Sequence, residues 1–193
     1  MMSQILPLPK VSPLVRTVKV LYGDHPKLPS VSVYFQGCDA TPKCFDCHNP
    51  ETWTFSNDFS VDFDYLESKV LEKLGILFSR YPRASLALLG GEPLSMHNRV
   101  FAYKLAKVVK ERYQDRVVTI LYTWRLPKDL LDVDIPLEYF DEFVMGRYMR
   151  EYAKEGFPAS KNQIYLDSVS VLTIIDSLKK VWLNRPSLTL LRY

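Results

Sequence analysis

Short apolar runs alternate with longer amphipathic segments along this chain, and that alternation limits the possible fold more than any other feature. The amphipathic segments, 62–81 and 98–113, carry apolar residues at helical spacing, and Asn98 is placed to cap the second helix. Their inward-facing residues are predicted to be Leu66, Val70, Leu74 and Leu77, then Leu105, Val108 and Val109. The short runs are typical of strands and cover 18–21, 31–35, 85–89, 117–122 and 143–145. This order predicts an α/β domain with a mainly parallel sheet.

The remaining segments are less regular. Residues 148–162 are typical of a loop, and residues 169–183 are apolar in a way that fits either a strand or a helix. The last ten residues, 184–193, are expected to form a tail with some order. With 193 residues and 47% apolar side chains, the chain has the length of one domain and ample material for a core. We therefore expect a single domain.

Charge and hydrophobicity exclude several classes of protein. The net charge of +3 is too small to indicate a nucleic-acid-binding protein. The N-terminal stretch 1–15 is interrupted by proline and has no basic segment before a long apolar run, so a signal peptide is not expected. No uncharged stretch approaches the roughly 18–20 residues of a membrane span. We expect a cytoplasmic protein, in a reducing environment where thiols bind metals or react more often than they cross-link.

All three cysteines, Cys38, Cys44 and Cys47, lie in one ten-residue window directly after the second predicted strand. An odd number of clustered thiols cannot be consumed by internal disulfides. Soft thiolates suit zinc or an iron–sulfur cluster, and three ligands leave one position open at a centre that prefers four. The alternatives at this point are a redox dithiol and a structural zinc ion, whose fourth ligand would be His25, His48 or His97.

The residues around the cysteines resemble a known family. The string Cys-His-Asn-Pro-Glu-Thr-Trp at 47–53, with Gln-Gly-Cys at 36–38 and Gly-Gly-Glu-Pro at 90–93, is similar to the radical S-adenosylmethionine (SAM) enzymes. More narrowly it resembles the activating enzymes of glycyl-radical proteins, above all the activases of anaerobic (class III) ribonucleoside-triphosphate reductases. Weaker similarity lies at 121–124, 140–148 and 160–163. The resemblance covers about 17–168 and leaves 169–193 as a C-terminal extension.

The resemblance implies a partial, open (β/α) barrel and a set of cofactors. Cys38, Cys44 and Cys47 would hold three irons of a [4Fe-4S] cluster and leave the fourth iron for the amino and carboxylate groups of SAM. Reductive cleavage of SAM then provides a radical that takes a hydrogen atom from a glycine Cα. The implied partners are a large glycyl-radical protein and a low-potential electron donor such as flavodoxin or ferredoxin. The implied cofactor contacts are the backbone at Asp46, then His48, Gly90, Gly91, Glu92 and Thr123.

The Gly-Gly-Glu-Pro string suits its implied role. It follows the third predicted strand, and α/β folds bind ligands at the carboxyl ends of parallel strands. Glycines lack a Cβ and let the backbone approach a ligand closely. The ammonium group of SAM needs acceptors, which backbone carbonyls or the Glu92 carboxylate can provide. The alternative is an ordinary turn between a strand and a loop.

Two features depart from the family pattern. The superfamily usually spaces its cysteines Cys-x3-Cys-x2-Cys, whereas residues 39–43 put five residues between the first two here. We interpret this as a two-residue insertion, since loop-closure entropy grows slowly with length. Asp46 stands where many members carry an aromatic residue. For His48, beside a predicted ligand, we favour a loop-stabilising role over a metal-ligating one.

Three other functions compete with this interpretation. The chain could activate a different glycyl-radical enzyme, such as pyruvate formate-lyase. It could be a radical SAM enzyme that acts on a small molecule, such as a deazapurine-forming synthase, although those lack the His-Asn-Pro string. The third alternative is a zinc-stabilised binding module without catalysis, which would be colourless where an iron–sulfur protein is brown.

Overall fold

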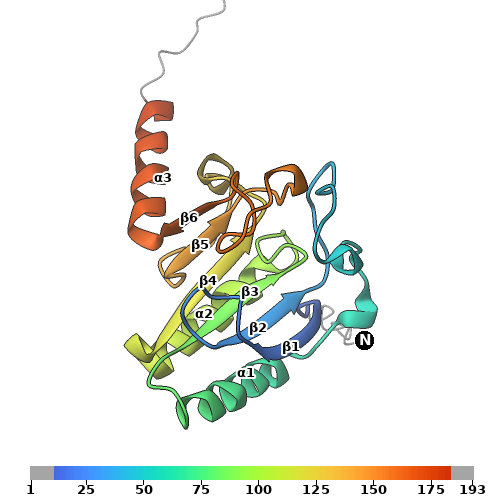
Figure 1. The fold of residues 1–193 in the computed structure, drawn as a ribbon, viewed down its shortest axis with the longest axis vertical. Coiled ribbons are helices and arrows are strands. Elements are labelled where there is room, and N and C mark those ends of the chain that lie inside the picture. Colours follow the sequence, from blue (N-terminus) through green and yellow to red (C-terminus); the bar gives the residue numbers. More distant parts are fainter. Residues whose placement is uncertain (1–10, 184–193) are drawn as a thin grey trace, which may run out of the picture.

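The computed structural model describes residues 11–183, whose strands form one open sheet in the order β1-β2-β3-β4-β5-β6 (Figure 1). The central strands β2 to β5 are parallel, and β1 and β6 pair antiparallel at the two edges. The predicted α/β class and mainly parallel sheet are confirmed. The strands are β1 (Val15–Leu21), β2 (Ser30–Phe35), β3 (Ala84–Gly90), β4 (Val117–Thr123), β5 (Glu142–Met145) and β6 (Ile164–Asp167).

The first predicted helix is present as α1 (Phe63–Phe78). It begins where the Asp62 carboxylate accepts hydrogen bonds from the backbone N–H groups of Asp64 and Tyr65, which have no partner within the helix. The apolar stripe faces the sheet as predicted, because the residues with the least exposure in α1 are Leu66, Val70, Leu74 and Leu77.

The second helix, α2 (Arg99–Tyr113), begins after Asn98, but the Asn98 side chain does not cap it. The buried Asn98 amide instead donates to the carbonyl of Gln36 at 2.9 Å and accepts from the N–H of Leu14 at 3.1 Å. The capping prediction was therefore wrong, because Asn98 connects the segments that flank β1 and β2. Of the three residues predicted to face inward, Leu105 and Val109 are buried and Val108 is half-buried.

The two faces of the sheet are covered differently. One large hydrophobic cluster joins the helices to one face, with Val33 and Leu88 from the strands and Val70, Leu105 and Ile175 from the helices among its members. The opposite face carries a small cluster of Ala87, Leu89, Ile120 and Val144, against which Phe157 packs. Because side chains alternate along a strand, the residues of the second face are those between the helix-facing ones. No helix of the described chain joins this second cluster, which leaves room for a cavity.

The C-terminal part differs from the prediction in two ways. Strand β6 was not predicted, because its side chains are mostly exposed and show no buried alternation, yet it pairs with β5. The ambiguous stretch 169–183 belongs to a helix, α3 (Ser168–Leu183), whose Val171 and Ile175 are buried against the core. The predicted tail, 184–193, lies outside the described residues.

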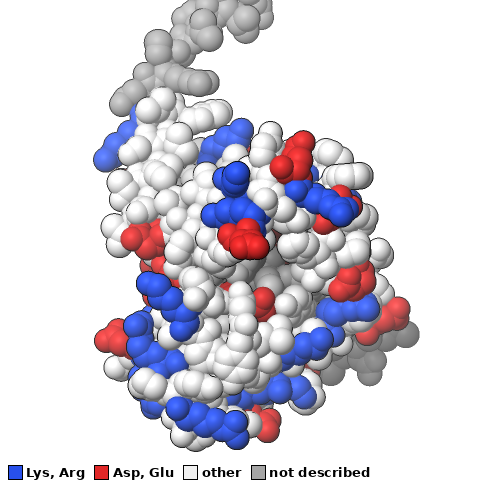
Figure 2. Space-filling view, in the orientation of Figure 1, with Lys and Arg blue, Asp and Glu red and all other residues white. Residues whose placement is uncertain are grey.

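Charged side chains are mixed on the face drawn in Figure 2, where Lys and Arg are interspersed with Asp and Glu. This distribution accords with the small net charge of +3. Within residues 11–183, the helices are all too short or too polar to cross a membrane.

Phe143 provides a test of the core. It lies on β5, is fully buried, and its ring centroid is 6.0 Å from that of Phe140. Phe143→Ala should lower the free energy of unfolding by about 3–5 kcal/mol, because it leaves a cavity in a packed core. Urea unfolding of the metal-free protein measures this loss. The matched control is Phe45→Ala, whose ring is 84% exposed and should change stability by less than about 0.5 kcal/mol. Equal losses in the two variants would contradict this placement of β5.

Candidate functional site

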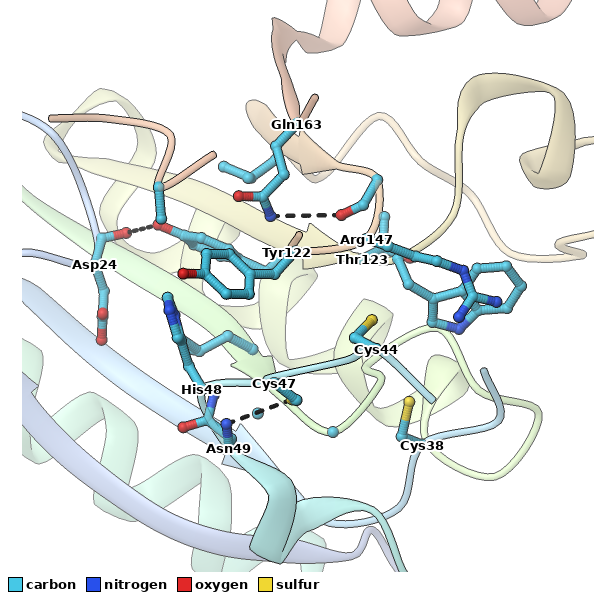
Figure 3. Close-up of a pocket in the computed structure, with 18 of the residues that line it drawn as sticks. Asp24, Cys38, Cys44, Cys47, His48, Asn49, Tyr122, Thr123, Arg147 and Gln163 are labelled. Carbon is cyan, nitrogen blue, oxygen red and sulfur yellow. Dashed lines mark hydrogen bonds between the residues drawn. The ribbon is translucent and has the colours of Figure 1, made fainter. Parts of the chain in front are cut away.

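The carboxyl ends of the parallel strands surround a cavity of about 360 Å³ (Figure 3). The loop after β2 and the segment after β5 rise over this edge of the sheet (Figure 1). This is the place where α/β sheets usually bind ligands, and the volume suits a small molecule. The fold brings together in the cavity wall most of the predicted site residues: Cys38, Cys44, Cys47, His48, Gly90, Gly91 and Thr123.

The cysteine loop is closed at its base by backbone pairing. The chain leaves β2 through Gly37 and Cys38, whose N–H groups donate to the carbonyls of Thr52 and Trp53 at 2.8 and 3.0 Å. The buried side chain of Gln36 donates to two further carbonyls of the returning segment. The two ends of the cysteine loop are therefore held side by side, and all three thiols lie between them along the chain.

The three thiols differ in exposure. Cys38 is 8% exposed, whereas Cys44 and Cys47 are half-buried. Cys47 Sγ accepts a hydrogen bond of 3.4 Å from the N–H of Asn49. Burial raises the pKa of the Cys38 thiol to about 11 and also raises the pKa of Cys44. A coordinated cation would have to displace these protons, because the thiolate is the ligand form.

The donor set fits an iron–sulfur cluster. Three thiols from one loop border the same cavity, and thiolates are the usual ligands of such clusters. Within residues 11–183, no three His, Cys, Asp or Glu side chains are gathered closely enough to hold a single metal ion. The three cysteines are thus distributed around a cavity rather than collected at one point.

Asp39, the first residue of the spacer 39–43, is held by two residues that follow β4. Its Oδ1 accepts from Trp124 Nε1 at 2.9 Å, and its Oδ2 accepts from Arg125 Nη2 at 2.6 Å. Burial alone would raise the pKa of Asp39, but these two donors hold it below its usual value. The spacer therefore starts with an ionised carboxylate whose two oxygens each accept a hydrogen bond.

The middle of the same spacer is held by a side chain from the segment after β5. Arg147 donates to the backbone carbonyls of Pro42 and Thr41, the latter at 3.1 Å. Its guanidinium lies 5.0 Å from the ring centroid of Trp124, a cation–π distance. The long spacer between Cys38 and Cys44 is thus held by hydrogen bonds from side chains that follow β4 and β5.

The Gly-Gly-Glu turn lies directly against the cysteine loop. The N–H of Gly91 donates to the carbonyl of Phe35, and the N–H of Glu92 donates to the carbonyl of Gly37, both at 2.8 Å. A Cβ at Gly90 would come within 2.6 Å of Phe35 O, and one at Gly91 within 2.3 Å of Gly37 O. Both distances are shorter than van der Waals contact, so each glycine permits a close approach between two backbone segments.

The Glu92 carboxylate is fully buried and has its partners within the protein. It accepts from the N–H groups of Leu94 and Trp124, at 2.9 and 3.1 Å, and from the Thr123 hydroxyl at 2.9 Å. Arg125 Nη1 lies 3.2 Å from it. Burial raises the pKa of Glu92 to about 7, while Arg125 and the hydrogen-bond donors act in the opposite direction. A contact to a ligand at position 92 would have to come from the backbone.

Asp46 and His48 flank Cys47 along the chain, and of the two only His48 lines the cavity. Asp46 adopts a left-handed backbone conformation (φ 56°), and its carboxylate lies 3.4 Å from Arg150. It lines a neighbouring pocket of about 570 Å³, together with Phe45, rather than the cysteine cavity. The His48 ring lies 3.9 Å from the ring of Tyr148, centroid to centroid, and so connects the cysteine loop to the segment after β5.

The wall opposite the cysteines combines residues from the segments of weaker family similarity, Tyr122 and Gln163, with Asp24 and Tyr34, which the sequence did not indicate (Figure 3). Tyr34 donates its hydroxyl to the Asp24 carboxylate at 3.0 Å, and Tyr122 donates to the Asp24 carbonyl at 2.8 Å. Burial raises the pKa of both tyrosines. Gln163 completes this side. These residues come from separate segments, so only the folded chain brings them to one side of the cavity.

Comparison with known proteins identifies relatives with a stated activity. Residues 29–166 match the 4Fe-4S single cluster domain family. An anaerobic ribonucleoside-triphosphate reductase-activating protein of Pasteurella multocida (strain Pm70) is 28% identical over 141 residues, covering 69% of this chain and 84% of the relative. A protein of the same name from Vibrio cholerae serotype O1 (strain ATCC 39315 / El Tor Inaba N16961) is 26% identical over 135 residues, with the same coverage. No solved structure gives a significant match. The resemblance to this group of activating proteins is confirmed.

Proposed function

The chain belongs to the 4Fe-4S single cluster domain family, and we propose that it is a radical SAM activase of an anaerobic ribonucleoside-triphosphate reductase. It would use SAM and one electron to place a glycyl radical on this large partner. The observation that carries the proposal is the similarity to two activating proteins of that reductase. The three thiols around one cavity support it.

The residues of the cavity take distinct roles in this proposal. Cys38, Cys44 and Cys47 hold the cluster, and the backbone of Gly90 and Gly91 borders the place of SAM. His48 and Thr123 complete its wall, and the adenine would extend from the cavity to the backbone at Asp46, which lines the neighbouring pocket. When bound, a reduced [4Fe-4S] cluster supplies the electron that cleaves the sulfonium–carbon bond of SAM and releases methionine. The resulting 5′-deoxyadenosyl radical would take a hydrogen atom from the glycine Cα of the partner, which would give 5′-deoxyadenosine and a glycyl radical.

The cavity is partly open to solvent, and this opening suits delivery to a protein. A reactive radical must be shielded from water, and a glycine-bearing loop of the partner would close the opening. We propose a low-potential protein such as flavodoxin or ferredoxin as electron donor, and the cytoplasm as the place of action. We also propose that the open sheet is a partial (β/α) barrel of the radical SAM type, in a single domain with its core at 17–168.

Paramagnetic resonance tests the proposed reaction. The anaerobically reconstituted protein is mixed with SAM, a reductant and the anaerobic reductase from the same organism. We expect the doublet signal of a glycyl radical, with methionine and 5′-deoxyadenosine formed alongside it. Omission of SAM and replacement of the reductase glycine by alanine are the controls. SAM cleavage with a radical on pyruvate formate-lyase alone would move the proposal to that partner, and cleavage without any protein radical would favour a small-molecule substrate.

A further inference from the structure

A chain of opposite charges joins the carboxyl ends of three neighbouring strands. Asp39 lies in the loop after β2, Glu92 in the turn after β3, and Arg125 just after β4. Arg125 Nη1 lies 3.2 Å from Glu92 Oε1, and Arg125 Nη2 lies 2.6 Å from Asp39 Oδ2. We call this arrangement of Asp39, Arg125 and Glu92 the Arg125 bridge.

The Arg125 bridge is buried at its Glu92 end, whereas the Asp39 side chain at the other end is 33% exposed. The Arg125 side chain is 11% exposed, and its guanidinium lies 4.7 Å from the ring centroid of Trp124. Trp124 in turn donates to the second oxygen of Asp39, so both oxygens of that carboxylate are engaged. A largely buried guanidinium and a carboxylate with both oxygens engaged hold their geometry better than an ion pair with a single contact between two exposed side chains, which is screened and mobile.

We infer that Arg125 is a positioning residue, which through Asp39 fixes the spacer 39–43 and sets Cys38 against the Gly-Gly-Glu turn. The inference rests on the proposed function, because it concerns a cluster held by Cys38. The spacer is two residues longer than the usual superfamily spacing, and a longer loop has more conformations to lose when it closes. Because Asp39 belongs to the spacer, the bridge restrains the part of the loop that is unusual.

Two substitutions break the bridge and spare the buried Glu92. Asp39→Asn keeps an oxygen for Trp124 but removes the charge that faces Arg125. Arg125→Lys keeps a cation beside Glu92, so the buried carboxylate still has a positive charge near it. An ammonium group, however, cannot span two carboxylates as a guanidinium does. The matched control is Asp134→Asn, which breaks an ion pair of 2.8 Å with Arg99, since neither of these two residues lines the cavity.

The rate of cluster loss to a chelator, followed by visible absorbance, is the main measurement. Residues that support metal ligands typically change metal affinity by about 10–100-fold, so we expect cluster loss about tenfold faster in Asp39→Asn and Arg125→Lys. The change that SAM causes in the paramagnetic spectrum of the reduced cluster should weaken in both. The double variant should lose its cluster no faster than the faster single variant, because both substitutions break one interaction. Asp134→Asn should behave as wild type.

Two results would overturn the inference while leaving the proposed function intact. One is cluster loss at the wild-type rate in both bridge variants. The other is a double variant whose effect equals the sum of the two single effects, since independent sites add. A wild-type protein that assembles no cluster would overturn the proposed function itself, and this inference with it. Thermal unfolding of the metal-free variants separates these results from a general loss of stability.

Discussion

Cys38→Ala should abolish both the cluster and the glycyl-radical activity. We expect anaerobically reconstituted wild-type protein to carry about four irons per chain, with a broad visible absorption that bleaches on reduction. Removing one of three thiolates leaves a cluster with two protein ligands, so iron content should fall to a small fraction and radical formation to background. Metal analysis and the paramagnetic assay measure the two effects. Cys44→Ala and Cys47→Ala should behave alike, because the chain has no other cysteine to replace a lost ligand.

Cys38 is the most informative of the three because it precedes the unusual spacer and is the most buried. The control is His48→Ala, since His48 is the neighbour that would complete a structural zinc site. If the cluster needs only the cysteines, His48→Ala retains its iron, although loss of the contact with Tyr148 weakens the loop. Tightly bound zinc without iron uptake, or equal metal loss in His48→Ala and Cys38→Ala, would instead support the zinc-stabilised module.

Local periodicity predicted most of the fold. The stripe of Leu66, Val70, Leu74 and Leu77 is buried because residues at helical spacing share one face. The buried parallel strands were recognised as short apolar runs, and the cysteine loop and the Gly-Gly-Glu turn follow β2 and β3 as predicted. Strand β6 was not predicted, because an exposed edge strand needs no apolar pattern. Its backbone hydrogen bonds to β5 are what make it a strand.

Long-range polar contacts were not predictable in this way. The sequence shows that Glu92 follows two glycines, but not that Arg125, which is far away along the chain, lies beside its carboxylate. Likewise Asn98 stands at a helix start, and only the folded chain offers it the carbonyl of Gln36. A motif thus indicates where a site lies, whereas the partners of its polar side chains depend on how separate segments meet.

The same distinction leads to a prediction for Gly91. The sequence predicts that this glycine lets the backbone approach a ligand closely, and on that basis alone added bulk would weaken SAM binding without loss of iron. In the folded chain a Cβ at Gly91 would lie 2.3 Å from Gly37 O and 2.8 Å from Thr52 O, both in the base of the cysteine loop. Gly91→Ala should therefore displace that loop, lower the free energy of unfolding by about 1–3 kcal/mol, and reduce iron and SAM binding together.

Gly23→Ala is the matched control for Gly91→Ala. Gly23 lines the same cavity, but a Cβ there would meet nothing within 4 Å, so iron content, SAM binding and stability should all stay close to wild type. Metal analysis, equilibrium binding of SAM and urea unfolding separate the possibilities. A Gly91→Ala protein with full iron content and wild-type stability, but without SAM binding, would mean that the ligand rather than the cysteine loop requires the glycine. If iron content, SAM binding and stability all fall in Gly91→Ala but not in Gly23→Ala, the turn supports the cysteine loop, and SAM binding depends on this support.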